Sequence, residues 1–222
     1  YVVGGPVNNG GVVFRWVRDN LFDAEKSTAE LLHQDSYDLL TKIASQVPAG
    51  SEGLIFHPFL GGERAPLWDA NARGSFFGLT QLHNRTHMAR AVLEGIVYNL
   101  NSVLLAVEEV VGKPQTILAT GGFARSQFWC QLLADVFGRP VTIPQAFESS
   151  CLGAAVVGLK AVGMVQDFNI VTKLVGATNV YQPDPTNHAV YQEMIPIYNQ
   201  LTQQLSPLYG KIAQFQKEHA HD

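Results

Sequence analysis

Apolar residues recur at helical spacing in several segments, and glycine-rich turns separate these segments. The clearest stripe runs through residues 86–112, where Thr86 is the predicted N-cap and Gly112 follows the last apolar position. The tail, residues 188–219, has a helical pattern that Pro196 and Pro207 are expected to break or kink. Shorter helices are predicted at about residues 12–22, 27–43, 126–137 and 149–162.

Short apolar runs predict strands that alternate with these helices. They lie at residues 1–3, 53–56, 116–120 and 141–143. Residues 58–79 contain too many glycines, prolines and polar residues for a regular element and are expected to form a long ordered loop. The alternation predicts an α/β fold, with helices packed on a mostly parallel sheet.

Composition narrows the class of protein. The chain is 46% hydrophobic, which is enough for a buried core, and its net charge of -4 comes without any basic run. Nucleic acid is therefore not an expected partner. Cys130 and Cys151 form no CxxC motif, so a reducing, cytoplasmic location is expected. No uninterrupted apolar stretch reaches membrane-spanning length, and no membrane association is expected.

The commonest local signatures of catalytic sites are absent. The chain has no GxxxxGK[ST], GxGxxG, GxSxG or HExxH. His83 and His87 are four residues apart, but His83 precedes the predicted cap, so a metal site is not favoured. We predict no metal ligands and no catalytic residue in this chain.

Two charged pairs have simple structural interpretations. Arg90 and Glu94 are four residues apart on one predicted helix and are expected to form a surface ion pair. Glu63 and Arg64 lie in the long loop and are expected to pair and pin it, although a position facing a cleft is the alternative.

Glycine-marked turns recur where apolar elements meet helices. They are Gly10-Gly11, Gly121-Gly122 and the small-residue segment that begins at Gly153. A strand that ends in two glycines lets a ligand approach the backbone closely, and the following helix directs N–H groups to the same place. For the glycine pair taken alone, a tight turn without a ligand is the favoured interpretation, and for Gly153 close helix packing is as good an explanation as ligand contact.

Longer motifs resemble one known family, the FGGY carbohydrate kinases. Residues 74–94, GSFFGLTQLHNRTHMARAVLE, fit the second signature of that family in full. GERAPLWDANARG resembles its characteristic loop, TGGFARS its adenosine motif, and ESSCLGAA the helix that closes the same pocket. The resemblance extends from about residue 3 to residue 163. The signature positions are Gly74, Phe76, Gly78, Leu79, His87, Met88, Ala91 and Glu94.

The resemblance implies an actin-like, ribonuclease H-like fold, with a mixed sheet and helices on both of its faces. Residues 1–222 would form the second, nucleotide-holding domain of such a kinase. Gly121 and Gly122 would lie against the adenosine of ATP, and the Ser126 hydroxyl would bond to the adenine. Gly11 and Arg15 would border the nucleotide from the other side. Mg²⁺ would be held mainly through the phosphates.

The resemblance also indicates what this chain does not contain. The phosphate-binding DxGT motif, the catalytic aspartate and the sugar pocket belong to the first domain of the family. The start at Tyr1 is expected to cut off the first strands of the second domain. The chain alone is therefore expected to be inactive and to need its N-terminal domain as a partner, and self-association into a homodimer stays open.

Within the family, TGGFARSQFW followed by ESSCLGAA is most similar to gluconate kinases. The resemblance thus implies phosphorylation of a small sugar or sugar acid, with gluconate as the expected substrate. Xylulokinase-like or glycerol kinase-like activity is the alternative within the family. A non-catalytic, actin-like nucleotide-binding module is the alternative outside enzymes.

Overall fold

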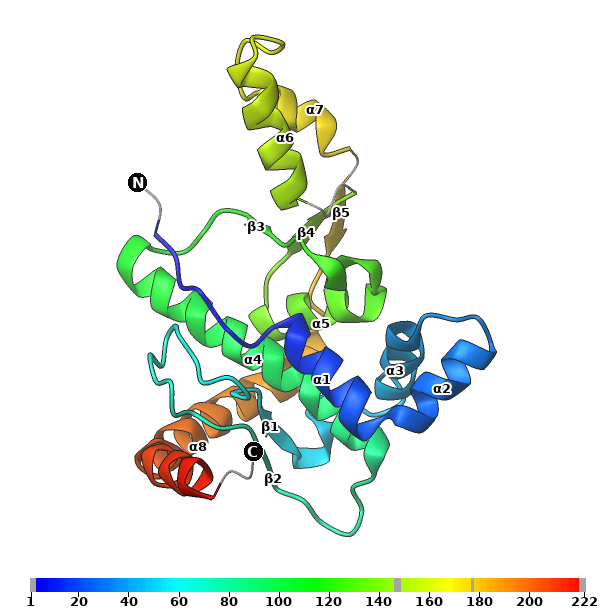
Figure 1. The fold of residues 1–222 in the computed structure, drawn as a ribbon, viewed down its shortest axis with the longest axis vertical. Helices are drawn as coiled ribbons and strands as arrows, with labels where there is room; N and C mark the ends of the chain where they lie inside the picture. The colour runs from blue at the N-terminus through cyan, green and yellow to red at the C-terminus, as the bar shows by residue number, and fades with distance from the viewer. Residues whose placement is uncertain (1–2, 146–148, 177, 220–222) are drawn as a thin grey trace. The chain divides into compact units, whose positions relative to one another are not determined.

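The computed structural model describes residues 3–145, 149–176 and 178–219. The chain divides into two units, which can be found in Figure 1 by the colour scale of residue numbers. Unit 1 contains residues 1–113 and 185–222, and unit 2 contains residues 114–184. Unit 1 is thus built from two separate stretches of chain, because the sequence of unit 2 is inserted between them.

Unit 1 is mostly helical. A short 3₁₀ turn, η1 (Ser51–Gly53), leads into strand β1 (Ile55–His57), which pairs antiparallel with β2 (Ser75–Phe77). The rings of Phe56 and Phe76 lie 4.6 Å apart across this pair. The helices of the unit are α1 (Gly11–Leu21), α2 (Asp23–Leu31), α3 (Ser36–Ala44), α4 (Arg85–Val111) and α8 (Pro185–Glu218).

Three predicted elements of unit 1 differ from the structure. The helix expected over 27–43 is two helices, because Asp35 accepts a hydrogen bond from the N–H of Tyr37 and caps a new helix there. The loop expected over 58–79 contains β2, which the Phe56–Phe76 contact stabilises. The opening strand lies partly outside the described residues, and residues 3–10 form no strand.

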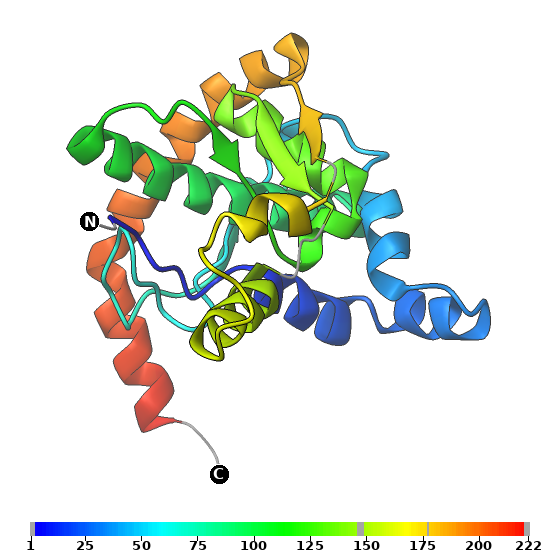
Figure 2. The same ribbon diagram turned by 90° about the horizontal axis from the view of Figure 1, so that it is seen from above.

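Helix α4 is the core of unit 1, and Figures 1 and 2 show it running through the middle of that unit. By length and composition it is apolar enough to cross a membrane, but 61% of its most apolar window is buried inside the protein. Its side chains pack on β1 and α3. Gly95 allows the closest approach, because a Cβ at this position would overlap the carbonyl oxygen of Phe56.

The start of α4 is capped two residues earlier than expected. Asn84, not Thr86, is the N-cap, and its side-chain oxygen accepts from the N–H groups of Thr86 and His87. The His87 ring accepts in return from the N–H of Asn84, which completes a capping box. The prediction failed because Asn and Thr both cap helices and only the backbone geometry distinguishes them.

Arg90 and Glu94 are buried, which corrects the expected surface pair. Their side chains are 6% and 1% exposed, and Arg90 Nε lies 2.6 Å from Glu94 Oε1. Glu94 also accepts from the N–H of Gly50, from the Ser51 hydroxyl and from the Tyr191 hydroxyl. The i,i+4 spacing is as predicted, but η1 and α8 cover this face of α4 and exclude water from it.

Helix α8 continues through both of its prolines instead of ending at them. Pro196 and Pro207 are exposed, so the carbonyl groups that lose a partner face solvent. The opposite face of α8 packs on the rest of unit 1, where Asn199 accepts from the Ser102 hydroxyl and Thr202 bonds to Nε2 of His57. The sequence of α8 thus completes the core that α4 begins.

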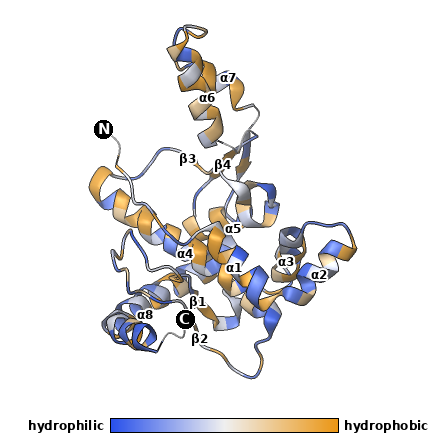
Figure 3. Cartoon of the chain, in the orientation of Figure 1, coloured by the Kyte–Doolittle hydropathy of each residue, from blue (hydrophilic) through white to orange (hydrophobic). Residues whose placement is uncertain are grey.

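Unit 2 contains a three-stranded mixed sheet in the order β3-β4-β5. Strand β3 (Ile117–Leu118) runs parallel to β4 (Val141–Pro144), and β5 (Thr178–Tyr181) pairs antiparallel with β4. Helix α5 (Gln127–Phe137) packs on this sheet, while α6 (Ser149–Ala161) packs on α7 (Ile170–Leu174). Figure 3 shows α6 as strongly hydrophobic. The predicted mixture of strands and helices is confirmed, but the expected mostly parallel sheet is wrong, because the described strands form two small sheets in which only the β3–β4 pair is parallel.

We predict that His57 makes unit 1 less stable below neutral pH. Burial lowers the pKa of His57 to about 4, while the unfolded chain has the ordinary value of 6.5. Because only the unfolded state binds a proton between these values, the free energy of unfolding should fall as pH decreases from 6.5 to 4. The loss should reach about 3 kcal/mol. Urea unfolding at several pH values measures this, and His57→Gln should flatten the profile. An unchanged profile in His57→Gln would contradict the prediction.

A second prediction concerns the close approach at Gly95. Gly95→Ala should lower the free energy of unfolding by roughly 2 kcal/mol or more, because the new methyl group overlaps Phe56. Gly210→Ala is the matched control, since Gly210 lies exposed in α8 with open space around its Cβ position. It should stabilise the helix by roughly 0.5–1 kcal/mol. Equal urea midpoints for the two variants would show that α4 does not depend on this contact.

Candidate functional site

The double glycine lies where the β3 strand of unit 2 turns into helix α5. Leu118 ends β3, and a 3₁₀ turn, η2 (Gly122–Arg125), connects the strand to the helix. Ser126 is the N-cap of α5. The structure therefore brings three predicted site residues, Gly121, Gly122 and Ser126, into one strand-to-helix turn.

The two glycines differ in what they require. Gly121 has a φ of 127°, a conformation that side chains rarely adopt, so the backbone itself requires glycine. Gly122 has no such constraint, and a Cβ placed on it would meet nothing within 4 Å. Neither the turn nor the packing explains Gly122. Its exposed backbone is a surface that a flat ligand can approach.

Ser126 has a structural role as the cap of helix α5. Its Oγ accepts a hydrogen bond from the N–H of Trp129 at 3.2 Å and so caps α5. Within the described part of the chain, the hydroxyl proton is donated to no protein atom. Capping and donation to a ligand are therefore compatible in the same residue.

A second contact ties α6 to this turn. The hydroxyls of Thr120 and Ser149 lie 2.8 Å apart, which joins the residue before the glycine pair to the first residue of α6. The motif ESSCLGAA begins at Glu148, which lies outside the described residues. Gly153 on α6 is exposed, and a Cβ there would meet nothing within 4 Å. Close helix packing thus does not explain Gly153 within unit 2.

The other two predicted site residues belong to unit 1. Gly11 and Arg15 are exposed on α1, one turn apart. Gly10 is the N-cap, no side chain caps the first turn, and that turn contains no acidic residue. Its N–H groups are therefore suited to a negatively charged ligand.

A buried carboxylate holds the segment that leads into α1. Glu63, 2% exposed, accepts from the backbone N–H of Asn8 at 2.7 Å. It also accepts from the Nδ2 atoms of Asn9 and Asn99 at 3.0 and 2.7 Å. The Arg64 guanidinium does not pair with Glu63, since its Nε donates to Asn8 Oδ1, and only the backbone N–H of Arg64 bonds to the Glu63 carboxylate. The loop is pinned as expected, but the predicted Glu63–Arg64 pair is wrong, because partners distant in sequence lie closer.

Asn9 and Asn99 were missed by sequence reasoning. Both are 2% exposed, and both donate to Glu63. Asn99 interrupts the apolar stripe of α4, which is a signal that could have been used, since a buried amide requires a polar partner.

The two histidines considered as metal ligands, His83 and His87, have structural hydrogen bonds instead. The Nδ1 of His83 accepts from the N–H of Thr80, and its Nε2 donates to the carbonyl of Glu52. His87 is used in the capping box of α4 and bonds to the Glu52 carboxylate at 3.2 Å. Among the described residues, no group of three His, Cys, Asp or Glu side chains could hold a metal ion.

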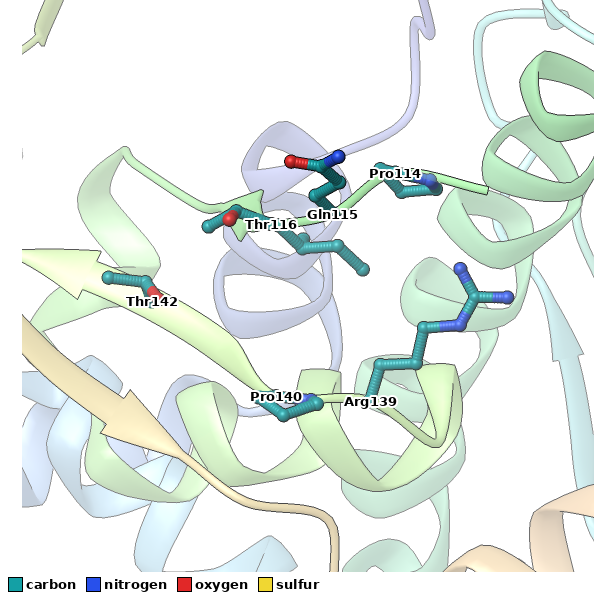
Figure 4. A pocket seen from close by; sticks show the side chains of 7 residues that line it. Pro114, Gln115, Thr116, Arg139, Pro140 and Thr142 are labelled. Carbon is teal, nitrogen blue, oxygen red and sulfur yellow. The ribbon is translucent and has the colours of Figure 1, made fainter. Parts of the chain in front are cut away.

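Unit 2 also has a pocket of about 250 Å³ at the starts of β3 and β4. Figure 4 shows Thr142 on β4 and the neighbouring Arg139 and Pro140 at its wall. Ligands of open α/β sheets bind beyond the carboxyl ends of parallel strands, where Gly121 lies, and this pocket is at the opposite ends. None of the predicted site residues lines it. Its lining consists of Pro114, Gln115, Thr116, Ile117, Arg139, Pro140 and Thr142.

Known proteins resemble this chain over nearly its whole length. The gluconokinase of Bacillus subtilis (strain 168) is 49% identical over 98% of the chain, and the chain spans 42% of that protein. The crystal structure of gluconate kinase from Lactobacillus acidophilus matches with a TM-score of 0.79 and 43% identity, over 94% of this chain and 40% of that one. A ligand-bound xylulose kinase from the same organism matches with a TM-score of 0.79 and 42% identity, with the same coverage.

The chain thus spans about two fifths of the length of the relatives that it matches. A profile of the FGGY family of carbohydrate kinases, C-terminal domain, matches residues 1–162. The structural neighbours are FGGY sugar kinases, so the expected actin-like fold is confirmed. By its sequence profile and its fold, the chain belongs to the FGGY family of carbohydrate kinases as a C-terminal domain.

Proposed function

We propose that this chain is the nucleotide-holding part of an ATP-dependent sugar-acid kinase that converts gluconate to 6-phosphogluconate. The observation that carries the proposal is the open space at Gly122, in a family motif of a chain 49% identical to a gluconokinase. A flat adenosine can lie on glycine backbone, and the nearby Ser126 hydroxyl can bond to an edge of the base.

The chemistry assigned to this chain is binding and orientation. Phosphoryl transfer depends on positioning the phosphates and stabilising their charge, with a base that orients the sugar hydroxyl. Gly121, Gly122 and Ser126 would hold the adenosine, while Gly11 and Arg15 would border the nucleotide. We assign the catalytic base and the sugar pocket to an N-terminal domain of the same protein, and Mg²⁺ to the phosphates of ATP.

The full-length protein provides the direct test. Purified enzyme is incubated with ATP and Mg²⁺ against gluconate, xylulose and glycerol, and ADP release is measured with a coupled assay. Gluconate should give the highest kcat/KM, and 6-phosphogluconate dehydrogenase should detect the product. Higher kcat/KM for another of these substrates would reject gluconate, and ATP binding without turnover on any of them would reject the kinase.

A xylulokinase activity is the second candidate, because the xylulose kinase structure matches this chain as well as the gluconate kinase structure does. A non-catalytic nucleotide-binding module is the alternative outside enzymes. We further propose a cytoplasmic location, in keeping with a free buried thiol at Cys130 and an exposed one at Cys151. A homodimer is compatible with this assignment.

We predict that Gly122→Val obstructs the nucleotide while leaving the fold intact. The valine side chain would enter the open space at Gly122, so the KM for ATP should rise roughly tenfold or more while the KM for gluconate changes little. Gly210→Val is the control, because it places the same side chain on an exposed glycine of α8. Steady-state kinetics and thermal melting of both variants decide the point. A lowered melting temperature with unchanged KM for ATP would assign Gly122 to the turn alone.

Ser126→Ala should weaken ATP binding only several-fold, since one neutral hydrogen bond contributes about 1 kcal/mol. It should also destabilise α5 by about 1 kcal/mol through loss of the cap. Asp35→Ala removes a comparable cap from α3 and serves as the control for stability. Calorimetry should find weaker nucleotide binding in Ser126→Ala than in Asp35→Ala. Equal affinities would leave Ser126 as a cap only.

A further inference from the structure

We propose that Glu63 is a positioning residue for the nucleotide, which acts through Asn8 and Asn9 on the Gly10-Gly11 turn at the start of α1. This inference rests on the proposed function, because it takes α1 as one border of the ATP site. It adds a residue in the long loop that contacts no reacting group and still controls how well ATP is held.

The Glu63 carboxylate is almost fully hydrogen-bonded and almost fully buried. Oε1 accepts from the N–H groups of Asn8 at 2.7 Å and Arg64 at 2.8 Å. Oε2 accepts from the amides of Asn9 at 3.0 Å and Asn99 at 2.7 Å. Four donors thus converge on two oxygens, and only a carboxylate can accept from all of them.

Asn9 extends this network to the loop backbone. Its Nδ2 donates to the carbonyl of Gly62 at 2.6 Å as well as to Glu63, and its Oδ1 accepts from the N–H of Gly61 at 3.4 Å. The backbone N–H of Ala65 donates to the carbonyl of Pro6 at 2.9 Å. Residues 6–9 are therefore held along the loop at both ends of the segment.

This segment leads directly into the Gly10-Gly11 turn, which we propose borders the nucleotide. Gly10 follows Asn9 and accepts the first helical hydrogen bond of α1, from the N–H of Val13 at 3.0 Å. Further along α1, buried Phe14 and Val17 hold the helix from its other side. Among the described residues, a Cβ on Gly10 or Gly11 would meet nothing within 4 Å, so side-chain packing at these two positions does not hold the turn. Its position is thus set by Asn9 on one side and by the buried face of α1 on the other.

Glu94 provides a matched comparison in the same unit. It too is a buried carboxylate with four donors, from Gly50, Ser51, Arg90 and Tyr191. These donors come from Gly50 at the start of η1, from η1 itself, and from α4 and α8, and none adjoins a predicted site residue. Loss of either carboxylate should destabilise the fold, but only Glu63 adjoins the turn proposed to meet ATP.

The experiment uses the full-length enzyme with Glu63→Gln, Glu94→Gln and the milder Asn99→Ala. Glu63→Gln turns an acceptor into a donor that faces other donors, so the segment should shift. The KM for ATP and the calorimetric Kd for ADP should rise roughly tenfold, while the KM for gluconate stays within about twofold of the wild type. Asn99→Ala should raise both values roughly threefold, because Asn99 acts only through Glu63.

The Glu94→Gln control and the melting temperatures distinguish a specific effect on nucleotide binding from a general loss of stability. Glu94→Gln should lower the melting temperature at least as much as Glu63→Gln but leave the ADP affinity unchanged. Equal ADP affinities in wild type and Glu63→Gln would overturn the proposal, as would equal losses in the two glutamine variants. If Glu63→Gln does not fold, Asn99→Ala decides, and an unchanged Kd for ADP in that variant overturns the proposal.

The two proposals can fail independently. A wild-type protein that binds ADP but phosphorylates no sugar would reject the kinase, and the calorimetric comparison of the variants would still test Glu63. A kinase with normal turnover whose ADP affinity ignores Glu63 would keep the proposed function and reject the positioning role.

Discussion

Unit 1 depends on the hydrogen bonds that the buried carboxylate of Glu94 accepts. One side chain in the middle of α4 joins the 3₁₀ turn before β1, its own helix and the C-terminal helix α8. A buried charge without partners is very costly, so these segments are stable only in one mutual arrangement. The close approach at Gly95, on the neighbouring position of the same helix, depends on that arrangement because it presses β1 against α4.

Local patterns predicted much of this fold. The helices α1, α5 and α6 and the strand β4 lie within one or two residues of their expected bounds, because apolar periodicity and glycine turns are local signals. The Gly121-Gly122 turn also lies where it was expected, between β3 and α5. Long-range partners could not be predicted in this way. The spacing of Arg90 and Glu94 says nothing of Tyr191, which covers them from about a hundred residues away.

In the candidate site too, features set by neighbouring residues could be predicted, and contacts between distant residues could not. Ser126 could be placed from its sequence neighbours, and its capping role follows from the same local geometry. Glu63 was expected to pair with the Arg64 side chain next to it, but its side-chain partners, Asn9 and Asn99, come from two other segments. The sequence alone could not show why Gly121 and Gly122 are glycines for different reasons. The φ angle explains Gly121, and the open space distinguishes Gly122.

The division of unit 1 between two stretches of chain has a consequence for synthesis on the ribosome. Residues 1–113 emerge before unit 2, and Arg90 and Glu94 are then synthesised but lack the helix α8 that covers them. All of unit 2 must be translated before Tyr191, Asn199 and Thr202 become available. Unit 2 is continuous and can begin to fold while the first part of unit 1 still exposes its core face. The nascent chain therefore exposes an aggregation-prone surface until α8 has been synthesised, and a chaperone can act on it during this interval.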